Sequence, residues 1–280
     1  SAHCRVSSQG DKQLCCEQIT LHCPSAQTDK LPGIVLPLLL PDLPVLLWWP
    51  DAPQVRARIF SSLCPTIDRL ILQSGAWITG WPAFCSLAQW ILRHQPQVHM
   101  MDLTWASLTG WREALAQFFD AEDGAALLQG IVRIEFQTTT AGFSPAAGWL
   151  LTWLATVLQW RLRHHAQPDF IGPSGPIRIS FAVPKAEAGQ DGLVSVALFT
   201  RCMGKTVRLQ ARRVNPLEIE CRRSDEAPVI LQIPRRTEME LLGQELDVAQ
   251  EDELFVRACR LLAQTVPAEE PDTTPDAGGA

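Results

Sequence analysis

Residues 44–94 alternate between short apolar runs and amphipathic stretches, and this alternation restricts the fold more than any other feature of the chain. Residues 44–49 and 68–74 form largely apolar runs, which are typical of strands buried on both faces. Residues 54–63 and 81–94 instead carry apolar side chains at helical spacing. The order strand, helix, strand, helix predicts a parallel sheet that is covered by helices.

The second half of the chain has a different pattern, with two long helical stretches and a series of short strand-like runs between them. A helix is expected over residues 145–163, with Ser144 as its N-cap and Pro145 at its first position. A final helix is expected over residues 237–266, with a break near Gly243. Between these helices, turn residues separate five short runs that predict an antiparallel meander, namely residues 177–183, 193–199, 206–211, 217–221 and 229–233.

The polar, proline-containing segment 94–101 predicts a boundary between two domains. We therefore expect an α/β fold in which residues 1–98 form an N-terminal α/β domain of the parallel type, with a further strand over residues 18–23. Residues 99–267 are expected to form a C-terminal α+β domain with an antiparallel sheet. The tail, residues 268–280, is rich in Pro, Gly, Asp and Glu and is expected to be disordered.

The net charge, the apolar segments and the cysteine spacing argue against several classes of partner and site. The formal net charge of -6 argues against nucleic acid, because phosphate binding requires a basic field. No membrane partner is expected, since residues 31–49 are interrupted by prolines and Asp42, and the apolar residues 146–160 are shorter than the ~20 residues that span a bilayer. Nine cysteines without a Cys-x2-4-Cys pair predict reduced thiols in a cytoplasmic protein and no metal site.

Familiar catalytic and cofactor motifs are missing from the sequence. It has no Gly-x-Gly-x-x-Gly, phosphate-loop, Gly-x-Ser-x-Gly or His-Glu-x-x-His motif. The glycine-rich residues 172–176 include two prolines, which lack the backbone donor that a phosphate cradle uses, so a turn is the better interpretation. We therefore expect no catalytic residue and no cofactor.

Three arginine pairs follow predicted strands near the C-terminus: Arg212–Arg213, Arg222–Arg223 and Arg235–Arg236. Because consecutive strand ends alternate in an antiparallel meander, the first and third pairs are expected at one edge of the sheet and the second at the opposite edge. One interpretation is a solvated edge that the acidic final helix partly neutralises. The other is a docking surface for an acidic partner, formed by Arg212, Arg213, Arg235 and Arg236.

Trp48 and Trp49 end the first predicted buried strand. Successive side chains of a strand point to opposite faces, so the two tryptophans cannot fill the same core. Either both pack under helices on the two faces of the sheet, or one of them reaches a partner surface, where tryptophan is a favoured anchor. Both are therefore candidate partner-binding residues.

Several segments resemble a known family: PDLPVLLWW at residues 41–49, DRLILQS at 68–74, DLTW at 102–105 followed by LTGWR at 108–112, and GWLLTWLA at 148–155. Their order and content resemble the OpcA family of glucose-6-phosphate dehydrogenase assembly proteins over most of residues 4–262. CCEQITL at residues 15–21 resembles its cyanobacterial branch. Family members usually carry a further segment before the position of Ser1, so the N-terminal domain is expected to lack its first segment.

The resemblance implies a non-catalytic allosteric activator and assembly factor of glucose-6-phosphate dehydrogenase, in the oxidative pentose phosphate pathway. It also implies thiol-based regulation, with thioredoxin as a further candidate partner. Cys202 and Cys221 are the candidate redox pair, because the predicted meander brings both to the same side of the sheet. A disulfide between them would require Cα atoms within about 4.4–6.8 Å.

Two alternatives stay open at this point. The first is a sugar-phosphate enzyme in which the arginine pairs hold the phosphate and Asp42 or Asp68 acts as a base, although both aspartates are also typical turn residues at strand starts. The second is a scaffold for an unrelated partner. Turnover by the isolated protein would identify the first, and the proteins that co-purify with it would identify the second.

Overall fold

The computed structural model describes residues 2–6, 13–17, 19–40, 43–52, 57–139, 141–164, 166–183, 192–224, 226–247 and 251–264. The predicted tail and Asp42 lie outside these residues. Contacts within the chain divide it into two compact units. Unit 1 comprises residues 1–43 and 56–66, and unit 2 comprises residues 44–55 and 67–280. The domain boundary after residue 98 stays a prediction.

The described residues of unit 1 form a hairpin and short helices. β1 (Ala2–Val6) pairs antiparallel with β2 (Gln13–Glu17), whereas residues 19–24 have no regular structure, so the strand predicted over residues 18–23 is wrong. Prolines interrupt the helical hydrogen bonding of the following segment, which is therefore broken into short turns. The helical elements are η1 (Ser25–Lys30), α1 (Leu31–Val35), η2 (Leu36–Leu38), α2 (Ala57–Leu63) and η4 (Cys64–Thr66).

Unit 2 contains a three-stranded parallel sheet in the order β3–β4–β5, which confirms the predicted α/β class. β3 (Leu46–Trp49) and β4 (Arg69–Leu72) are the two predicted strands. The third strand, β5 (His99–Asp102), lies where the sequence predicted only a polar boundary. Its four residues begin with an exposed His99 and end with a buried Asp102, so they lack the apolar run that marks the other two strands.

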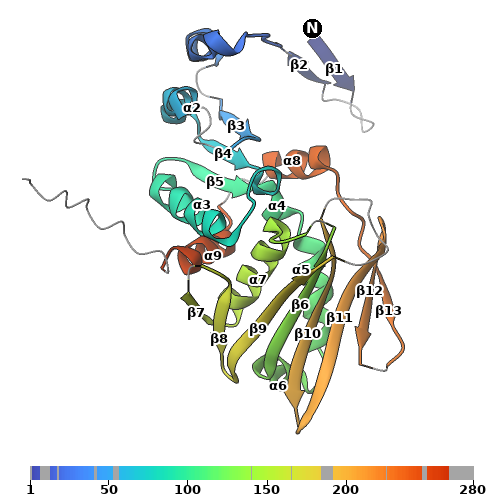
Figure 1. Cartoon of the computed structure of the whole chain (residues 1–280). Coiled ribbons are helices and arrows are strands. Elements are labelled where there is room, and N and C mark those ends of the chain that lie inside the picture. The colour runs from blue at the N-terminus through green and yellow to red at the C-terminus, as the bar shows by residue number, and fades with distance from the viewer. Residues whose placement is uncertain are drawn as a thin grey trace, which may run out of the picture. The chain divides into compact units, whose positions relative to one another are not determined.

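Four aromatic residues from four helices form the core beside this sheet: Phe84 of α3 (Trp81–His94), Trp105 of α4 (Leu103–Ala106), Trp149 of α7 (Pro145–Val157) and Phe255 of α9 (Glu253–Ala263). The ring centroid of Trp149 lies 4.5 Å from Phe84, 5.6 Å from Trp105 and 5.2 Å from Phe255. Trp149 Nε1 donates a hydrogen bond to Ser74 Oγ at 3.0 Å. Figure 1 shows α3, α7 and α9 side by side, in agreement with their contacts.

Both long helices predicted in the second half are shorter than expected. α7 begins as predicted, because Ser144 Oγ accepts a hydrogen bond from the Ala147 amide, but it ends at Val157 and β7 (Arg161–His164) follows. The final helix is interrupted after α8 (Glu238–Asp247) and not near Gly243, which lies inside α8. α9 then starts with its own N-cap, Asp252.

The large sheet has eight strands in the order β13–β12–β11–β10–β6–β9–β8–β7. β10 to β13 form the predicted antiparallel meander. The first predicted run, β9, is separated from β10 by β6 and pairs with β6 in parallel, so the sheet is mixed and not purely antiparallel. The strands not yet delimited are β6 (Ile131–Thr138), β8 (Asp169–Gly172), β9 (Gly175–Ala182), β10 (Leu193–Cys202), β11 (Lys205–Asn215), β12 (Glu218–Arg223) and β13 (Val229–Gln232).

Helices cover one face of this sheet. α5 (Thr109–Ala116) packs on β11 and β12, and α6 (Gly124–Gln129) packs on β10. The strand residues beneath these helices are apolar and buried, among them Ile134, Phe136, Val196, Leu198, Leu209 and Ile219. Figure 1 shows α5 and α6 behind the strands, with no labelled helix in front of them. The alternate residues of the same strands therefore face away from the helices.

Candidate functional site

We call the surface that faces away from α5 and α6 the open sheet face. Strand register places its side chains on one face: Arg178 and Ser180 of β9, Arg133, Glu135 and Gln137 of β6, Ser195, Ala197, Phe199 and Arg201 of β10, Arg208, Gln210 and Arg212 of β11, and Glu220 and Arg222 of β12. Six arginines therefore stand against two glutamates. This is a basic surface on a chain whose net charge is -6.

The two glutamates of the open sheet face are already paired. Arg133 Nη1 lies 3.1 Å from Glu135 Oε1, and Arg222 Nη2 lies 3.7 Å from Glu220 Oε1. Four further arginines are exposed and have no ion-pair partner among the described residues, namely Arg178, Arg201, Arg208 and Arg212. The surface thus keeps positive charge that an acidic partner could neutralise.

Phe199 lies at the centre of the open sheet face. The guanidinium carbon of Arg133 is 3.6 Å from the ring centroid of Phe199, and that of Arg208 is 5.7 Å from it. Arginine over an aromatic face is held in place by the ring quadrupole. The centre of the face therefore combines one half-buried aromatic ring with arginines in fixed positions, a composition found at protein interfaces.

A cavity of about 1130 Å³ forms the second candidate site within unit 2. It lies at the carboxyl ends of β4 and β5, where Gln73, Gly75, Leu103 and Thr104 line it, and at the start of α7. The far wall comes from the ends of β11 and β13 and from the segment before α8. Its charged lining residues are Arg213, Arg235, Arg236, Glu113 and Glu238.

The predicted docking arginines are divided between these two places. Arg212 lies on the open sheet face, whereas Arg213, the next residue of β11, points into the cavity. There it meets the predicted third pair, because the Arg235 amide donates to the Pro216 carbonyl at 2.6 Å and anchors residues 235–236 beside the end of β11. The expectation that the first and third pairs share an edge is thus met for Arg213, Arg235 and Arg236.

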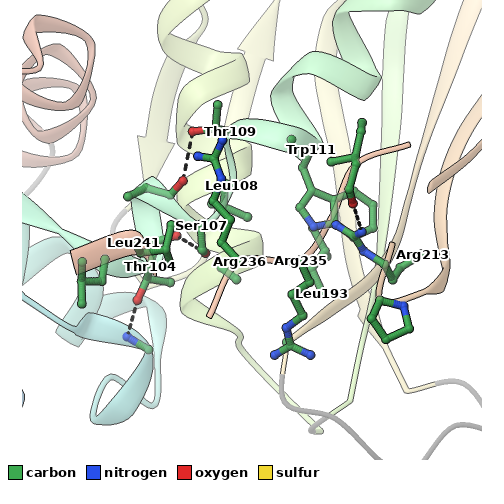
Figure 2. Close-up of a pocket in the computed structure, with 18 of the residues that line it drawn as sticks. Thr104, Ser107, Leu108, Thr109, Trp111, Leu193, Arg213, Arg235, Arg236 and Leu241 are labelled. Carbon is green, nitrogen blue, oxygen red and sulfur yellow. Dashed lines mark hydrogen bonds between the residues drawn. The ribbon is translucent and has the colours of Figure 1, made fainter. Parts of the chain in front are cut away.

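The guanidinium groups in the cavity differ in their partners. Arg213 Nη1 donates to the Ile233 carbonyl, and Arg236 Nη1 donates to Gln244 Oε1 at 2.6 Å. Figure 2 shows that the Arg235 and Arg236 side chains point in opposite directions. Burial lowers the pKa of the Arg213 guanidinium from its ordinary value, and the nearby charge of Arg235 lowers this pKa further.

The second predicted pair lies outside the cavity. Arg222 is on the open sheet face, and Arg223 turns to the helical side, where it forms an ion pair with Asp123 and another with Glu226 at 3.4 Å. The hydrogen bond from Arg223 holds the pKa of Asp123 below its usual value. The charge of Arg223 is therefore neutralised by carboxylates within the fold.

Trp48 and Trp49 point to opposite faces of β3, as predicted. Trp49 is buried. Trp48 is half-buried and packs against the apolar cluster of Ile71, Leu103, Ala106 and Leu241. The structure therefore favours packing for Trp49, while the exposed part of Trp48 leaves its role as an anchor a prediction.

The structure does not bring Cys202 and Cys221 together, contrary to the expected redox pair. Cys202 pairs with Lys205 and Cys221 pairs with Ala211, and these positions are about 20 Å apart along β11. A disulfide cannot bridge this separation. Burial raises the pKa of the Cys221 thiol to about 11, and its Sγ lies 3.7 Å from the Ala114 carbonyl oxygen. Cys221 therefore stays a protonated thiol at neutral pH.

The carboxylates considered as bases are committed elsewhere or outside the described residues. Asp68 Oδ2 accepts a hydrogen bond from the Val45 amide at 2.7 Å, at the opposite end of the parallel sheet from the cavity. Asp102 is buried and caps α4 through the Thr104 amide, and burial raises the pKa of its carboxyl.

Among the described residues, no three His, Cys, Asp or Glu side chains gather as a metal ion would require. Within the same ranges, every helix is too short or too polar to cross a membrane.

The open sheet face was missed by sequence reasoning. Arg133, Arg178, Arg201 and Arg208 occupy alternate strand positions with apolar residues between them, and this period of two was a usable signal. Their convergence depends on the insertion of β6 between β9 and β10, which places strands from distant parts of the chain side by side. The three arginine pairs are easier to recognise in the sequence, but only Arg212 and Arg222 of them lie on the open sheet face.

Comparison with known families gives matches over most of the chain. Residues 1–86 match the family described as the N-terminal domain of a glucose-6-phosphate dehydrogenase subunit. Residues 98–259 match the family described as the C-terminal domain of the same kind of protein. The two matches follow one another in the order that their descriptions imply.

Two cyanobacterial relatives carry the provisional designation "OxPP cycle protein OpcA". The one from Synechocystis sp. is 29% identical over 202 residues, which is 68% of this chain and 42% of that protein. The one from Nostoc punctiforme is 29% identical over 163 residues, which is 58% of this chain and 34% of that protein. The chain thus spans less than half the length of the curated relatives it matches.

Solved structures show only distant likeness. An oxidoreductase from Sinorhizobium meliloti aligns with a TM-score of 0.47 and 8% identity over 84% of this chain and 71% of that chain. An inositol dehydrogenase homolog from Azotobacter vinelandii aligns with a TM-score of 0.42 and 12% identity over 85% of this chain and 68% of that chain. Both TM-scores are too low to carry an argument about activity.

Proposed function

The chain belongs to the OpcA family of glucose-6-phosphate dehydrogenase assembly proteins, and we propose that it is a non-catalytic partner that binds glucose-6-phosphate dehydrogenase and favours its active oligomer. The observation that carries this proposal is the match of both family domains, in order, on one chain. The pathway served would be the oxidative pentose phosphate pathway.

The mechanism that we propose is allosteric. An activator of this kind must bind the active state of the dehydrogenase more tightly than the inactive state, and its effect is limited by that difference in affinity. It needs a stable surface and no reacting group. The open sheet face supplies such a surface, because its arginines are held on a sheet whose other face is packed against α5 and α6.

We propose the open sheet face as the contact with the dehydrogenase, and an acidic surface on that enzyme as its counterpart. The four arginines without ion-pair partners among the described residues would gain partners on binding, and the half-buried Phe199 would lie at the centre of the contact. Charged pairs at the rim of an interface mainly set specificity and the association rate, whereas the aromatic centre adds affinity. Of the residues that the sequence predicts to bind the partner, Arg212 belongs to this face, whereas the others lie elsewhere in unit 2, namely Trp48, Trp49, Arg213, Arg235 and Arg236.

The alternative of a sugar-phosphate enzyme has less support. Its arginines are present in the cavity, but Asp68 is held at the other end of the sheet by the Val45 amide. We also propose that the protein is cytoplasmic, that thioredoxin is a further partner, and that thiol oxidation controls its activity. The wide separation of Cys202 and Cys221 means that any such control would use other cysteine pairings.

We expect the protein to change the kinetics of the dehydrogenase from the same organism. At saturating concentration it should lower the apparent KM for glucose 6-phosphate, or raise the maximal rate, by roughly fivefold or more, a typical allosteric coupling. Initial rates of NADPH formation at several concentrations of the protein measure this effect. Heat-denatured protein is the control, and turnover by the protein alone would instead favour the enzyme alternative.

A further inference from the structure

Part of the positive charge of the open sheet face is arranged in a row that crosses four strands. The register pairs Arg178 of β9 with Arg133 of β6, which pairs in turn with Phe199 of β10, and Phe199 pairs with Arg208 of β11. Neighbouring strands lie about 4.8 Å apart, so Arg178 and Arg208 are roughly 14 Å apart along the row. Both are exposed and have no ion-pair partner among the described residues. An extended acidic segment that crosses these strands would meet the charges one after another.

The acidic groups of α8, of α9 and of the residues between them are engaged away from this row. Glu240 Oε2 accepts a hydrogen bond from the Thr237 amide at 2.7 Å. Glu251 Oε1 accepts one from Gln95 Nε2 at 2.9 Å, and Asp252 is the N-cap of α9. Within the described ranges, no carboxylate of α8 or α9 forms an ion pair with the open sheet face. The charge of the row is therefore left for another partner.

Residues 265–280, which we call the acidic segment, follow the last described residue. They carry four carboxylates and no Lys, Arg or His; the carboxylates belong to Glu269, Glu270, Asp272 and Asp276. The open sheet face has six arginines and two glutamates and thus a net charge of +4, and the acidic segment supplies a charge of -4. The two charges therefore match in size and are opposite in sign.

The acidic segment begins close to one edge of the large sheet. α9 ends at Ala263 and contacts β7, the edge strand two places from β9, and Figure 1 shows α9 beside β7. The strand spacing puts β9 about 10 Å and β11 about 24 Å from β7 across the sheet. Sixteen residues span about 50 Å when extended, since each residue adds up to about 3.3–3.6 Å. The acidic segment is therefore long enough to cross the sheet to Arg208.

We propose that the acidic segment lies along this row, with its carboxylates beside Arg178 and Arg208, and so covers the open sheet face from within the same chain. Individual ion pairs on a surface are weak. Attachment to α9 raises the effective concentration of the segment at the face to about millimolar, which compensates for the weakness of each pair. The contact is electrostatic and should loosen as the salt concentration rises.

This contact would regulate the binding of the dehydrogenase, and that consequence rests on the proposed function. An acidic surface of the enzyme would have to displace the acidic segment before it could reach the arginines. The segment would therefore lower the apparent affinity for every acidic surface. A weakly acidic surface would be excluded and a strongly acidic one could still bind, which makes the face more selective.

Digestion of the whole protein with a glutamate-specific protease, without any dehydrogenase, tests the contact. Cleavage after Glu269 releases residues 270–280, and mass spectrometry of the remaining chain gives its rate. In about 50 mM salt, the double variant Arg178→Gln and Arg208→Gln should be cleaved about fivefold faster than the unchanged protein, because a segment held on the face cannot enter the protease active site. In about 0.5 M salt, the two rates should be equal.

Arg257→Gln with Arg260→Gln is the matched control for the digestion. Both arginines are exposed on α9, so this variant removes two positive charges that are nearer to the acidic segment in the sequence but outside the open sheet face. Its cleavage rate should stay within about twofold of that of the unchanged protein. The inference is overturned if the Arg178 and Arg208 variant is cleaved no faster than the unchanged protein, or if the control is accelerated equally.

The affinity for the dehydrogenase gives a second measurement. Asp272→Asn with Asp276→Asn should bind the enzyme about threefold more tightly than the unchanged protein, whereas Asp120→Asn with Glu122→Gln, at two exposed carboxylates outside the acidic segment, should leave the affinity unchanged. Equal affinities for all three proteins would contradict the regulatory role. Absence of any complex, together with salt-dependent protection of the bond after Glu269, would contradict the proposed function and support the contact.

Discussion

Replacing Trp149 with alanine is expected to lower the free energy of unfolding by about 3–5 kcal/mol, the usual cost of deleting a fully buried tryptophan. Trp149 is 0% exposed and contacts the rings of Phe84, Trp105 and Phe255. Its removal leaves a cavity where α3, α4, α7 and α9 meet, and it leaves Ser74 Oγ without the indole donor. Thermal unfolding should show a midpoint lower by roughly 10 °C.

Trp153→Ala is the matched control for this prediction. Trp153 is on the same helix but is less completely buried than Trp149, so its loss removes less buried surface. Urea titration of both variants compares the two free energies directly. Equal destabilisation by the two changes, or no destabilisation by Trp149→Ala, would contradict the packing of α7 described above.

Reversing two charges on the open sheet face is expected to have the largest effect on function. Arg208 and Arg212 are exposed and lie on β11 without ion-pair partners among the described residues. The double change Arg208→Glu and Arg212→Glu would set like charges against an acidic partner, which costs several kcal/mol at an interface. We expect the affinity for the dehydrogenase to fall by about 100-fold or more, measured by surface plasmon resonance at constant ionic strength.

The matched control for the charge reversal is Arg257→Glu, which is exposed on α9 and does not belong to the open sheet face. It changes the net charge in the same direction but should leave the affinity within about twofold, since distant surface charges are screened by salt. Unchanged unfolding midpoints would show that both variants fold. If the double variant bound the dehydrogenase as tightly as the unchanged protein, the contact would have to lie on another surface.

Local patterns explain which parts of the fold could be predicted. The apolar runs of β3 and β4 and the helical spacing of α3 are set by neighbouring residues, so their types were correct. β5 was missed because its four residues carry a histidine and an aspartate. α7 was predicted too long because apolar residues continue past Val157, while Gln159 adopts a φ of 55°, outside the helical range, and Trp160 is buried just before β7.

Strand order is the part that the sequence left undetermined. The meander of β10 to β13 could be predicted, because its strands are consecutive and joined by short turns. The insertion of β6 between β9 and β10 depends on packing between distant segments, which no local pattern records. For this reason the open sheet face could not be assembled from the sequence, and Cys202 and Cys221 were expected closer together than they are.

Direct association with glucose-6-phosphate dehydrogenase tests the central proposal most simply. The protein and the enzyme would be mixed at micromolar concentrations and separated by size-exclusion chromatography with light scattering. We expect a shared peak whose mass exceeds that of either component, and we expect the Arg208→Glu and Arg212→Glu variant to elute apart from the enzyme. Separate elution of the unchanged protein and the enzyme, with unaltered kinetics of NADPH formation in the mixture, would contradict the proposal.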